Sequence, residues 1–414
     1  ENLGMKRNGS RGSLLESPLG GASPAQRARR GSSDALPSLS QSSRLLMRRR
    51  NSSVLSVEVE SNGPRSLSGA RRTRRSRFPR GFSLAASEVE TEPEQLQEIK
   101  QLQGGQKIFD LFSWNKVLQE EGDGGKVVVC QPKGESSLPR KDYVLKMRSK
   151  ESLQRDRMEE QFRRAQERLL NLPPHVGVLP LEEVLEDEHY YYIVMECAKG
   201  GSFLPSLLAE FKDGVMPEEA VKRLMRELLE AVGHVHAQGM LHRDIKPDNL
   251  VMQLVGGAEG EEPRRKVALI DFDHAEPEYD PNTPSRGGFC GTVLFSAPEA
   301  VYGECSQASD LYSVGVVLYL LMSGKLPYPE EVFGAYYENL KLKQMAPRCP
   351  WQERRRNWKG AVVQRMRETP VDWTCSPWPE LLDCQAFCKW LLAFDVTSRP
   401  VSAEEALGDH WFDS

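Results

Sequence analysis

A run of polar residues at 242–249 has types and spacing suited to phosphate chemistry. The run is His-Arg-Asp-Ile-Lys-Pro-Asp-Asn, and an Asp-Phe-Asp motif begins 22 residues after its last residue. Asp244 could accept a hydroxyl proton, while Asn249 and Asp271 could hold a divalent cation between two loops. Transfer of a phosphoryl group requires such a base, such metal ligands and a cation on the phosphates. The spacing therefore predicts phosphoryl transfer; a surface loop with charges placed by chance is the alternative.

A candidate for the required cation is Lys146, at the end of a strand-like apolar run. Upstream, eight residues beginning at Glu120 are similar to the pattern G-x-G-x-x-G-x-V, in which glycines let the backbone approach phosphate oxygens. Gly122, Gly125 and Val127 fit the pattern, and Glu120 takes the place of its first glycine. A plain hairpin turn would have the same sequence, so the loop predicts a phosphate cradle only together with Lys146.

The elements that position these residues require a sizeable core, and the composition supports one. Of the 414 residues, 39% are hydrophobic and 28% are charged, which is typical of a globular protein with two or three domains. Charge is uneven: residues 1–84 hold 17 of the 55 Lys and Arg but 5 of the 59 Asp and Glu. This arm therefore carries +12, and the rest of the chain carries −16 within the net −4. Such asymmetry predicts contact of the arm with an anionic partner or with the acidic body, and a solvated arm is the alternative.

The first 95 residues are rich in Ser, Arg, Gly and Pro and poor in aromatic residues. Such a segment buries too little apolar surface to offset the entropy of ordering, which predicts disorder. Arg-x-x-Ser motifs recur in it, and four of them end at Ser32, Ser52, Ser68 and Ser83. They predict sites for a basophilic kinase, where phosphate would cancel the charge of the arm. Compositional bias alone is the alternative.

From about Gln106 the pattern becomes globular, first with strands and then with helices. Strands are expected within 108–118, 126–130, 143–147, 178–185 and 190–195. Helices are expected at 151–171, at 217–238 and from Asp310 through the apolar run to Met322. A glycine-rich stretch at 256–260 predicts an enlarged hairpin turn. Residues 345–370, which include Arg354-Arg355-Arg356, are expected to be an insertion, either a solvated loop or a docking patch.

The eight cysteines are scattered and include no Cys-x-x-Cys pair. This argues against a zinc ribbon or a disulfide framework and favours a reducing compartment. Cys384 and Cys388, four residues apart, are expected to pack in the core. The longest apolar run, at 314–322, is too short to span a bilayer, and no signal peptide is visible. We therefore expect a cytoplasmic or nuclear protein with no membrane span and no nucleic-acid partner.

Taken together, the motifs resemble those of eukaryotic protein kinases of the serine/threonine type. The octet is similar to their catalytic loop, with Lys246 as the serine/threonine feature, and Ala297-Pro298-Glu299 is similar to their Ala-Pro-Glu motif. The resemblance implies that Glu299 forms a buried ion pair with Arg399. The closing run 404–412 most resembles the calcium/calmodulin-dependent protein kinase group.

The resemblance covers about residues 106–413 and implies an α+β, bilobal kinase fold. In that fold a small β-rich N-lobe precedes a larger helical C-lobe. The implied domains are a disordered Ser/Arg-rich arm at 1–105, the N-lobe and hinge at 106–198, and the C-lobe at 199–414.

The same resemblance implies a nucleotide site between the lobes, with ATP and Mg²⁺ as cofactors. Lys146 would grip the α- and β-phosphates and pair with a helical glutamate, for which Glu167 is the candidate and Glu160 the alternative. The hinge residues that would contact the adenine end are Met195 in the gatekeeper position, Glu196 through its carbonyl and Ala198 through its amide.

The catalytic roles implied by the resemblance fall on five residues. Asp244 would orient the acceptor hydroxyl, and Lys246 would contact the γ-phosphate. Thr292 would hydrogen-bond with both Lys246 and Asp244. Asn249 and Asp271 would hold magnesium, which keeps octahedral geometry with few protein ligands.

Four positions depart from the family pattern: Glu120, Asp273, Ser202 and Gly288. Asp273 replaces the glycine of Asp-Phe-Gly, which changes the backbone freedom of that loop. Ser202 stands where basophilic kinases place a glutamate. Gly288 occupies the usual phospho-acceptor position, with Thr283 and Ser285 as nearby substitutes.

Two functions from different classes fit these motifs. The first is an active serine/threonine kinase that uses Mg-ATP and acts on protein substrates. The second is a nucleotide-binding pseudokinase that acts as a scaffold through its basic arm. The intact Lys146, Asp244, Asn249 and Asp271 favour the enzyme.

Overall fold

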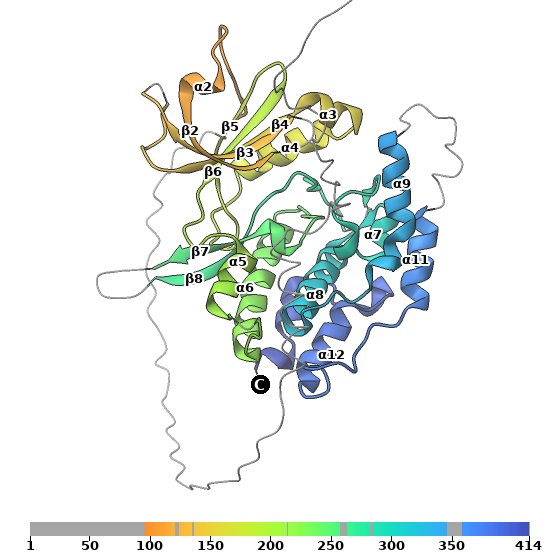
Figure 1. The fold of residues 1–414 in the computed structure, drawn as a ribbon. Coiled ribbons are helices and arrows are strands. Elements are labelled where there is room, and N and C mark those ends of the chain that lie inside the picture. The colour runs from red at the N-terminus through yellow and green to blue at the C-terminus, as the bar shows by residue number, and fades with distance from the viewer. Residues whose placement is uncertain are drawn as a thin grey trace, which may run out of the picture. The chain divides into compact units, whose positions relative to one another are not determined.

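The computed structural model describes residues 96–120, 124–134, 136–212, 214–256, 263–281, 285–345 and 358–413. The arm that was expected to be disordered lies outside the described residues, and with it Ser32, Ser52, Ser68 and Ser83. Gly122 and Arg354-Arg355-Arg356 also lie outside them. The described residues form a β-rich N-terminal lobe followed by a helical C-terminal lobe, as the sequence predicted (Figure 1).

One six-stranded sheet dominates the N-terminal lobe, in the order β1-β5-β6-β4-β3-β2 (Figure 1). Its strands are β1 (Lys100–Gln101), β2 (Phe112–Glu120), β3 (Lys126–Pro132), β4 (Tyr143–Ser149), β5 (Leu181–Glu186) and β6 (Tyr190–Glu196). Neighbours pair antiparallel except β1 and β5, which are parallel. The apolar side chains of β2, β3, β4 and β6 form a core that includes Phe112, Tyr143 and Val194.

Two boundaries of this lobe differ from those expected. Residues 178–180 do not join β5, since Val178 instead makes an isolated bridge to Leu269 and Pro180 lacks the N–H that a strand needs. At the other end, the lobe begins before residue 106. Ile99 is buried in one cluster with Phe162 and Leu170, and β1 extends the sheet.

The expected helix at 151–171 is two helices, α3 (Lys150–Arg155) and α4 (Glu159–Leu170). Arg157 has a left-handed backbone with φ 59°, which no helix can continue through. Ser149 caps α3 by accepting the amide of Ser152. A short helix, α2 (Ile108–Leu111), precedes β2 where the sequence predicted the entry to a strand.

The C-terminal lobe is helical, and α8 runs through its core (Figure 1). Its helices are α5 (Phe203–Glu210), α6 (Glu218–Ala237), α7 (Pro298–Tyr302), α8 (Gln307–Ser323), α9 (Gly334–Met345), α11 (Trp358–Glu368), α12 (Leu382–Leu391) and α13 (Ala403–Leu407). Every residue of α8 from Ala308 to Ser323 is buried, which confirms the expected central helix. None of the described helices combines the length and the apolar character needed to cross a membrane.

Short strands and turns connect these helices. They are η1 (Pro247–Asn249), β7 (Leu250–Val255), β8 (Arg264–Leu269), β9 (Ser285–Arg286), η2 (Val293–Phe295), β10 (Glu304–Cys305), η3 (Glu330–Phe333), η4 (Val396–Ser398) and η5 (His410–Phe412). The strands β7 and β8 pair antiparallel, as a hairpin requires. The glycine-rich turn between them lies outside the described residues except for Gly256.

The expected insertion at 345–370 is partly ordered structure. Its second half is α11, which buries Val362, Val363 and Met366, so a solvated loop is the wrong description there. Residues 346–357 lie outside the described part of the chain.

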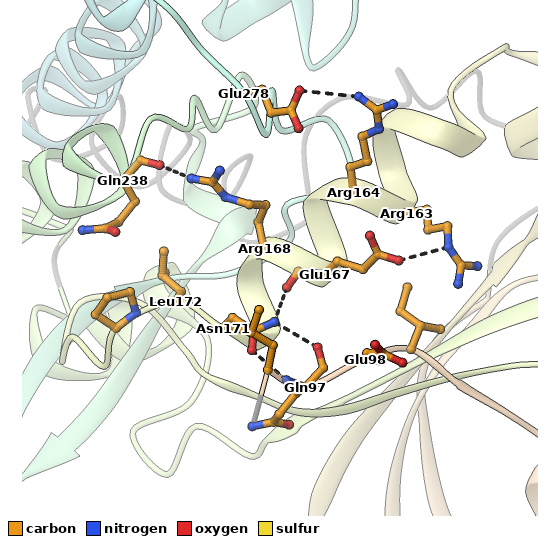
Figure 2. Close-up of a pocket in the computed structure, with 13 residues that line it drawn as sticks. Gln97, Glu98, Arg163, Arg164, Glu167, Arg168, Asn171, Leu172, Gln238 and Glu278 are labelled. Atoms are coloured by element: carbon orange, nitrogen blue, oxygen red, sulfur yellow. Dashed lines mark hydrogen bonds and ion pairs between the residues drawn. The ribbon is translucent and has the colours of Figure 1, made fainter. Parts of the chain in front are cut away.

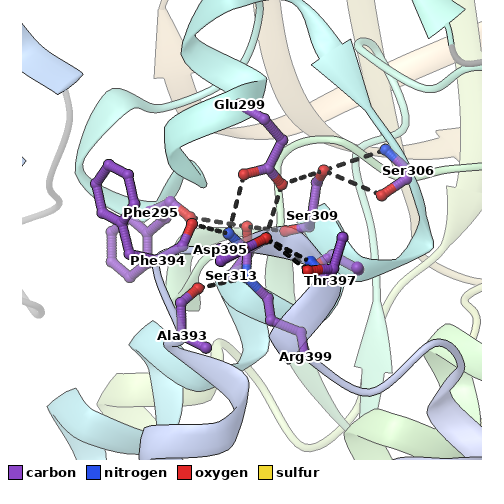
Figure 3. Close-up of polar contacts among 11 residues, drawn as sticks. Phe295, Glu299, Ser306, Ser309, Ser313, Ala393, Phe394, Asp395, Thr397 and Arg399 are labelled. Atoms are coloured by element: carbon purple, nitrogen blue, oxygen red, sulfur yellow. Dashed lines mark hydrogen bonds and ion pairs between the residues drawn. The ribbon is translucent and has the colours of Figure 1, made fainter. Parts of the chain in front are cut away.

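The expected ion pair between Glu299 and Arg399 is confirmed (Figure 3). Two parallel bonds join the guanidinium to the carboxylate at 2.7 and 2.9 Å, and Ser309 donates to the same carboxylate at 2.8 Å. The Arg399 side chain is 0% exposed, and its remaining donors bond backbone carbonyls. This network ties the start of α7 to the end of the domain.

Candidate active site

One buried carboxylate fixes the backbone of the loop at 242–249, between α6 and β7, by hydrogen bonds. Asp310 of α8 accepts the backbone amides of His242 and Arg243, both at 2.9 Å, and the ring of His236 at 2.9 Å. Arg243 adopts a left-handed φ of 66°, a strained state that persists only where surrounding contacts enforce it. The central helix therefore fixes the backbone that presents the next residue, Asp244.

Asp244 lies at the centre of the loop, where one of its carboxylate oxygens is hydrogen-bonded and the other has no partner in the described residues. Its Oδ2 accepts from Lys246 at 2.8 Å and from Asn249 at 3.0 Å. Its Oδ1 is buried and meets no hydrogen-bond partner in the described part of the chain. Lys246 also donates to Thr292 at 2.8 Å, which confirms the expected contact between these two residues.

The approach of the Thr292 loop to Asp244 depends on a glycine. Gly291 has a φ of +83°, and a Cβ there would lie 2.5 Å from the carbonyl oxygen of Arg243. It would also lie 3.2 Å from the open Oδ1 of Asp244. No other residue could occupy this position without moving the catalytic loop.

Across the site, Lys146 of β4 reaches the loop after β8. Its ammonium lies 2.7 Å from Oδ1 of Asp271 and 2.9 Å from Oδ2 of Asp273. Asp271 has a left-handed φ of 64°, which turns the carboxylate away from the path of the preceding strand. Phe272 between the two carboxylates packs against the ring of His242, with the ring centroids 4.5 Å apart.

The charges at this lysine perturb one another because both carboxylates lie within 3 Å of the ammonium. Burial opposes ionisation of Asp271, but the nearby Lys146 outweighs it, so the pKa of Asp271 lies well below its usual range. Burial, then the charge of Asp271, raises the pKa of the Asp273 carboxyl. Burial alone would lower the pKa of Lys146, but the two carboxylates have the larger effect, so the pKa of Lys146 is raised. The lysine is therefore a permanent cation.

The expected pair between Lys146 and Glu167 is not formed. Glu167 points into a different pocket, where its carboxylate, 42% exposed, bonds Arg163 one turn earlier at 3.1 Å (Figure 2). The alternative, Glu160, bonds Arg164 at 2.6 Å. Gln166 of α4, together with Leu169, lines one small cavity that Lys146 and Asp271 also line.

The structure describes all but one of the other residues that the sequence placed at a nucleotide site. Val127 pairs directly opposite Lys146 across β3 and β4, so the two belong to one rung of the sheet. Met195, at the end of β6, lines the same small cavity as Lys146. Glu196 closes β6 and Ala198 follows it, while Gly125 precedes β3. Gly122 lies outside the described residues.

Comparison with known proteins agrees with this geometry. The sequence model of the protein kinase domain matches residues 117–412, more than half of the chain. This chain belongs to the protein kinase domain family. The match begins within β2, continues through the rest of the N-terminal lobe and the C-terminal lobe, and includes every loop that supplies the residues above.

Curated relatives are kinases of plants, among other organisms. Calcium/calmodulin-dependent serine/threonine-protein kinase 1 of Oryza sativa subsp. japonica is 30% identical over 229 residues, which are 53% of this chain and 36% of that protein. CBL-interacting protein kinase 16 of the same organism is 35% identical over 198 residues, 47% of this chain and 40% of that protein. CDPK-related kinase 1 of Arabidopsis thaliana is 27% identical over 270 residues, 63% of this chain and 45% of that protein. The chain thus spans less than half of the length of these relatives.

The donor atoms of this kinase domain fit a magnesium ion that is held jointly with phosphates. The described residues include no group of three His, Cys, Asp or Glu side chains that would form a protein-only metal site. Magnesium in phosphoryl-transfer sites instead takes one or two protein ligands and completes its shell with phosphates and water. Asn249 donates its amide nitrogen to Asp244, so its carbonyl oxygen would be the metal ligand, and Asp271 would supply the charge.

An aromatic contact anchors the activation segment of this kinase, and sequence reasoning missed it. Phe289 lies 5.8 Å from Tyr336 of α9 and 5.5 Å from Trp358 of α11, measured between ring centroids, and those two rings are 5.1 Å apart. The signal was present in the sequence as Phe289 beside the unphosphorylatable Gly288, but its partners lie about 50 and 70 residues away.

The arginine of the catalytic loop is enclosed beside the same segment. Arg243 pairs with Glu276 at 3.4 Å and lies near the thiols of Cys290 and Cys305. Burial raises the pKa of Cys290 to about 12 and also raises that of Cys305, so both thiols stay neutral. Arg243 is thus buried beside one carboxylate and two neutral thiols, and its Nε meets no hydrogen-bond partner in the described part of the chain.

Proposed function

We propose that the protein is a serine/threonine kinase that transfers the γ-phosphoryl group of Mg-ATP to hydroxyl groups of protein substrates. The observation that carries the proposal is the open Oδ1 of Asp244, held in place by Lys246 and Asn249. A base that is buried, oriented and without a partner in the described residues is what an incoming hydroxyl requires.

The residues around this base have complementary tasks. Asp244 orients the acceptor hydroxyl and takes its proton at Oδ1. Lys246 stands between Asp244 and Thr292 and would steady charge that develops on the transferred group. Bound Mg-ATP would supply the phosphoryl group and the neutralising charge for its transfer. Lys146 would hold the α- and β-phosphates, and Asn249 and Asp271 would hold the metal ion.

The adenine end would be bound by the hinge between the lobes. The carbonyl of Glu196 and the amide of Ala198 would meet adenine beside Met195. Val127 and the glycine loop with Gly122 and Gly125 would cover the nucleotide from above. The resemblance to the family supports these roles.

The alternative is a nucleotide-binding pseudokinase that acts as a scaffold. It would be favoured by the loss of a base, a metal ligand or the strand lysine, and this chain retains Lys146, Asp244, Asn249 and Asp271. The enzyme is therefore the better conclusion.

Transfer of radiolabelled phosphate from ATP to a degenerate peptide library tests the proposal. We expect incorporation into Ser and Thr peptides by the wild-type chain and none above background by Asp244→Asn, which keeps the shape of the side chain. Equal incorporation by both proteins would remove Asp244 from the mechanism, and nucleotide binding without any transfer would favour the scaffold.

The basic arm and the location belong to the same proposal. We infer that the +12 arm contacts the acidic kinase domain within one molecule, supported by the opposite charge of the remaining chain. The scattered cysteines support a reducing compartment, the cytoplasm or the nucleus.

A further inference from the structure

A second carboxylate contacts the strand lysine from a position where the family pattern has glycine. Asp273 lies 2.9 Å from the ammonium of Lys146 and 2.8 Å from the guanidinium of Arg148. Lys146 and Arg148 are two residues apart on β4 and therefore project from the same face of the sheet. The Asp273 side chain is 11% exposed, and that of Lys146 is 8% exposed. Asp273 is thus a buried bridge between two cations.

The helix beside the lysine has no carboxylate to offer it. Gln166 faces the cavity at 2% exposure, and its amide nitrogen meets no hydrogen-bond partner among the described residues. A neutral amide cannot balance an ammonium. The glutamates of α4 contact other groups: Glu160 and Glu167 bond arginines of their own helix, and Glu159 accepts from Tyr191.

A buried ammonium needs a counter-ion that stays when the nucleotide site is in use. A lone buried charge is costly, and an unpaired lysine would swing out of position. Asp271 contacts the lysine here, but the proposed function requires Asp271 as a metal ligand. Asp273 is the carboxylate that remains available, and Arg148 prevents it from turning away.

We propose that Asp273 is the positioning residue of Lys146 and takes the part that a helical glutamate would take if Gln166 were glutamate. This inference rests on the proposed function, and it assigns a role to the residue that departs from the Asp-Phe-Gly pattern. The carboxylate that pairs with the lysine thus comes from the loop that also supplies Asp271, whereas in the family pattern it comes from the helix. Pairing of the lysine therefore does not depend on where α4 lies.

Two substitutions at Asp273 and one at Gln166 test this exchange. Asp273→Asn keeps the shape and removes the charge, and Asp273→Gly restores the family residue. Both are expected to lower kcat/KM for ATP by about 10- to 100-fold, the loss that follows when a reacting group is misplaced by about 1 Å. Gln166→Glu, added to Asp273→Gly, is expected to recover most of the loss because it returns a carboxylate from the helix side.

Equilibrium binding separates positioning from general damage to the site. Asp273→Asn is expected to weaken ADP binding several-fold and leave adenosine binding unchanged, because adenosine has no phosphates for Lys146 to hold. Glu167→Gln is the matched control: it removes a negative charge one residue from Gln166 and should leave both affinities and the rate within about twofold, since its partner is exposed.

Three results would overturn the inference. They are an Asp273→Asn rate within twofold of wild type, an equal loss of ADP and adenosine binding, or no recovery in the Asp273→Gly, Gln166→Glu double variant. Should the wild-type chain bind nucleotides and transfer no phosphate, the proposed function fails, and the ADP and adenosine affinities still decide the role of Asp273.

Discussion

At the scale of single residues, two carboxylates share the ammonium of Lys146, and only one of them is suited to a metal ion. Asp271 has the depressed pKa and the left-handed backbone that aims it across the site. We predict that Asp271→Asn lowers phosphotransfer by at least about 100-fold, as expected when one charged group of an electrostatic site is neutralised. The fold should persist, because the volume does not change and Asp273 still pairs with the lysine. Rates over a magnesium titration, together with thermal unfolding, measure both effects.

The matched control for this change is Asp383→Asn, an exposed carboxylate of α12. It should match the wild type in rate and in magnesium dependence. If Asp271→Asn also kept the wild-type magnesium dependence, Asp271 would not be a metal ligand.

Lys146 itself allows a second prediction at this scale. Lys146→Met should lose most of the activity and retain part of the nucleotide affinity, because the adenine contacts come from the backbone of the hinge. Kinetic assays and binding of ADP would measure the two effects. Wild-type rates in this variant would mean that another cation, with Arg148 the nearest candidate, holds the phosphates.

Sequence reasoning placed the catalytic loop, Lys146 and Asp271 correctly relative to one another, because short motifs with fixed spacing carry that information. It chose the wrong helical residue, since Glu167 was favoured for its charge, for its spacing from Lys146 and for its place just before Leu169. The buried face of α4 holds Phe162 and Leu169, and Gln166 lies four residues after the first and three before the second. Helical phase therefore places residue 166 inward and residue 167 about 100° away. The role of Asp273 needed coordinates, because its partners are 125 or more residues away.

At the scale of elements, the activation segment is held by aromatic packing. Phe289 contacts α9 and α11, and Gly288 beside it cannot accept a phosphate. We predict that the kinase is active without phosphorylation of this segment, so that phosphatase treatment leaves the rate within a few-fold. A mock treatment with inhibited phosphatase is the control. A large loss that maps to Thr283 or Ser285 would contradict the prediction.

The ion pair between Glu299 and Arg399 governs stability at this scale. Arg399→Met leaves the buried carboxylate without its guanidinium and should lower the free energy of unfolding by about 3–5 kcal/mol. Denaturant unfolding measures the loss. Arg164→Met is the control, because its contacts with Glu160 and Glu278 are exposed and such pairs contribute about 0–1 kcal/mol. Similar losses of unfolding free energy in both variants would show that burial does not determine how much this ion pair contributes to stability.

Elements with strong periodicity were predictable, and packed connections were not. The five predicted strands and the two long helices of the C-terminal lobe are present, because their apolar periods of two and of 3.6 are clear. The break at Arg157 was missed, since it lies in a charged stretch where no Gly or Pro marks a helix end. Residues 358–368 were taken for an insertion because their partners, Phe289 and Tyr336, are distant in sequence.

At the scale of the whole molecule, charge is divided between the arm and the kinase domain. The arm carries +12 and the remainder −16, and Arg-x-x-Ser motifs recur in the arm, among them those that end at Ser32, Ser52, Ser68 and Ser83. Phosphates add about −1.5 to −2 each, so that four would remove about half to two thirds of the charge of the arm. We predict that the arm competes with basic peptides for the acidic domain and that phosphorylation releases it. Exposed charge pairs are individually weak, so many of them together must hold the arm. Such a contact is sensitive to salt, because ions at physiological concentration screen exposed charges beyond about 8 Å.

The test compares the full chain with a variant in which Ser32, Ser52, Ser68 and Ser83 are all Asp. At low salt, the KM for a basic peptide should be lower in the variant, and at high salt the two values should converge. The same four positions as Ala control for the loss of serine, and a neutral peptide controls for a general change in rate. Only electrostatic competition depends on both the peptide charge and the salt. If the full chain and the Asp variant had equal KM values for the basic peptide at both salts, the arm would not contact its own kinase domain.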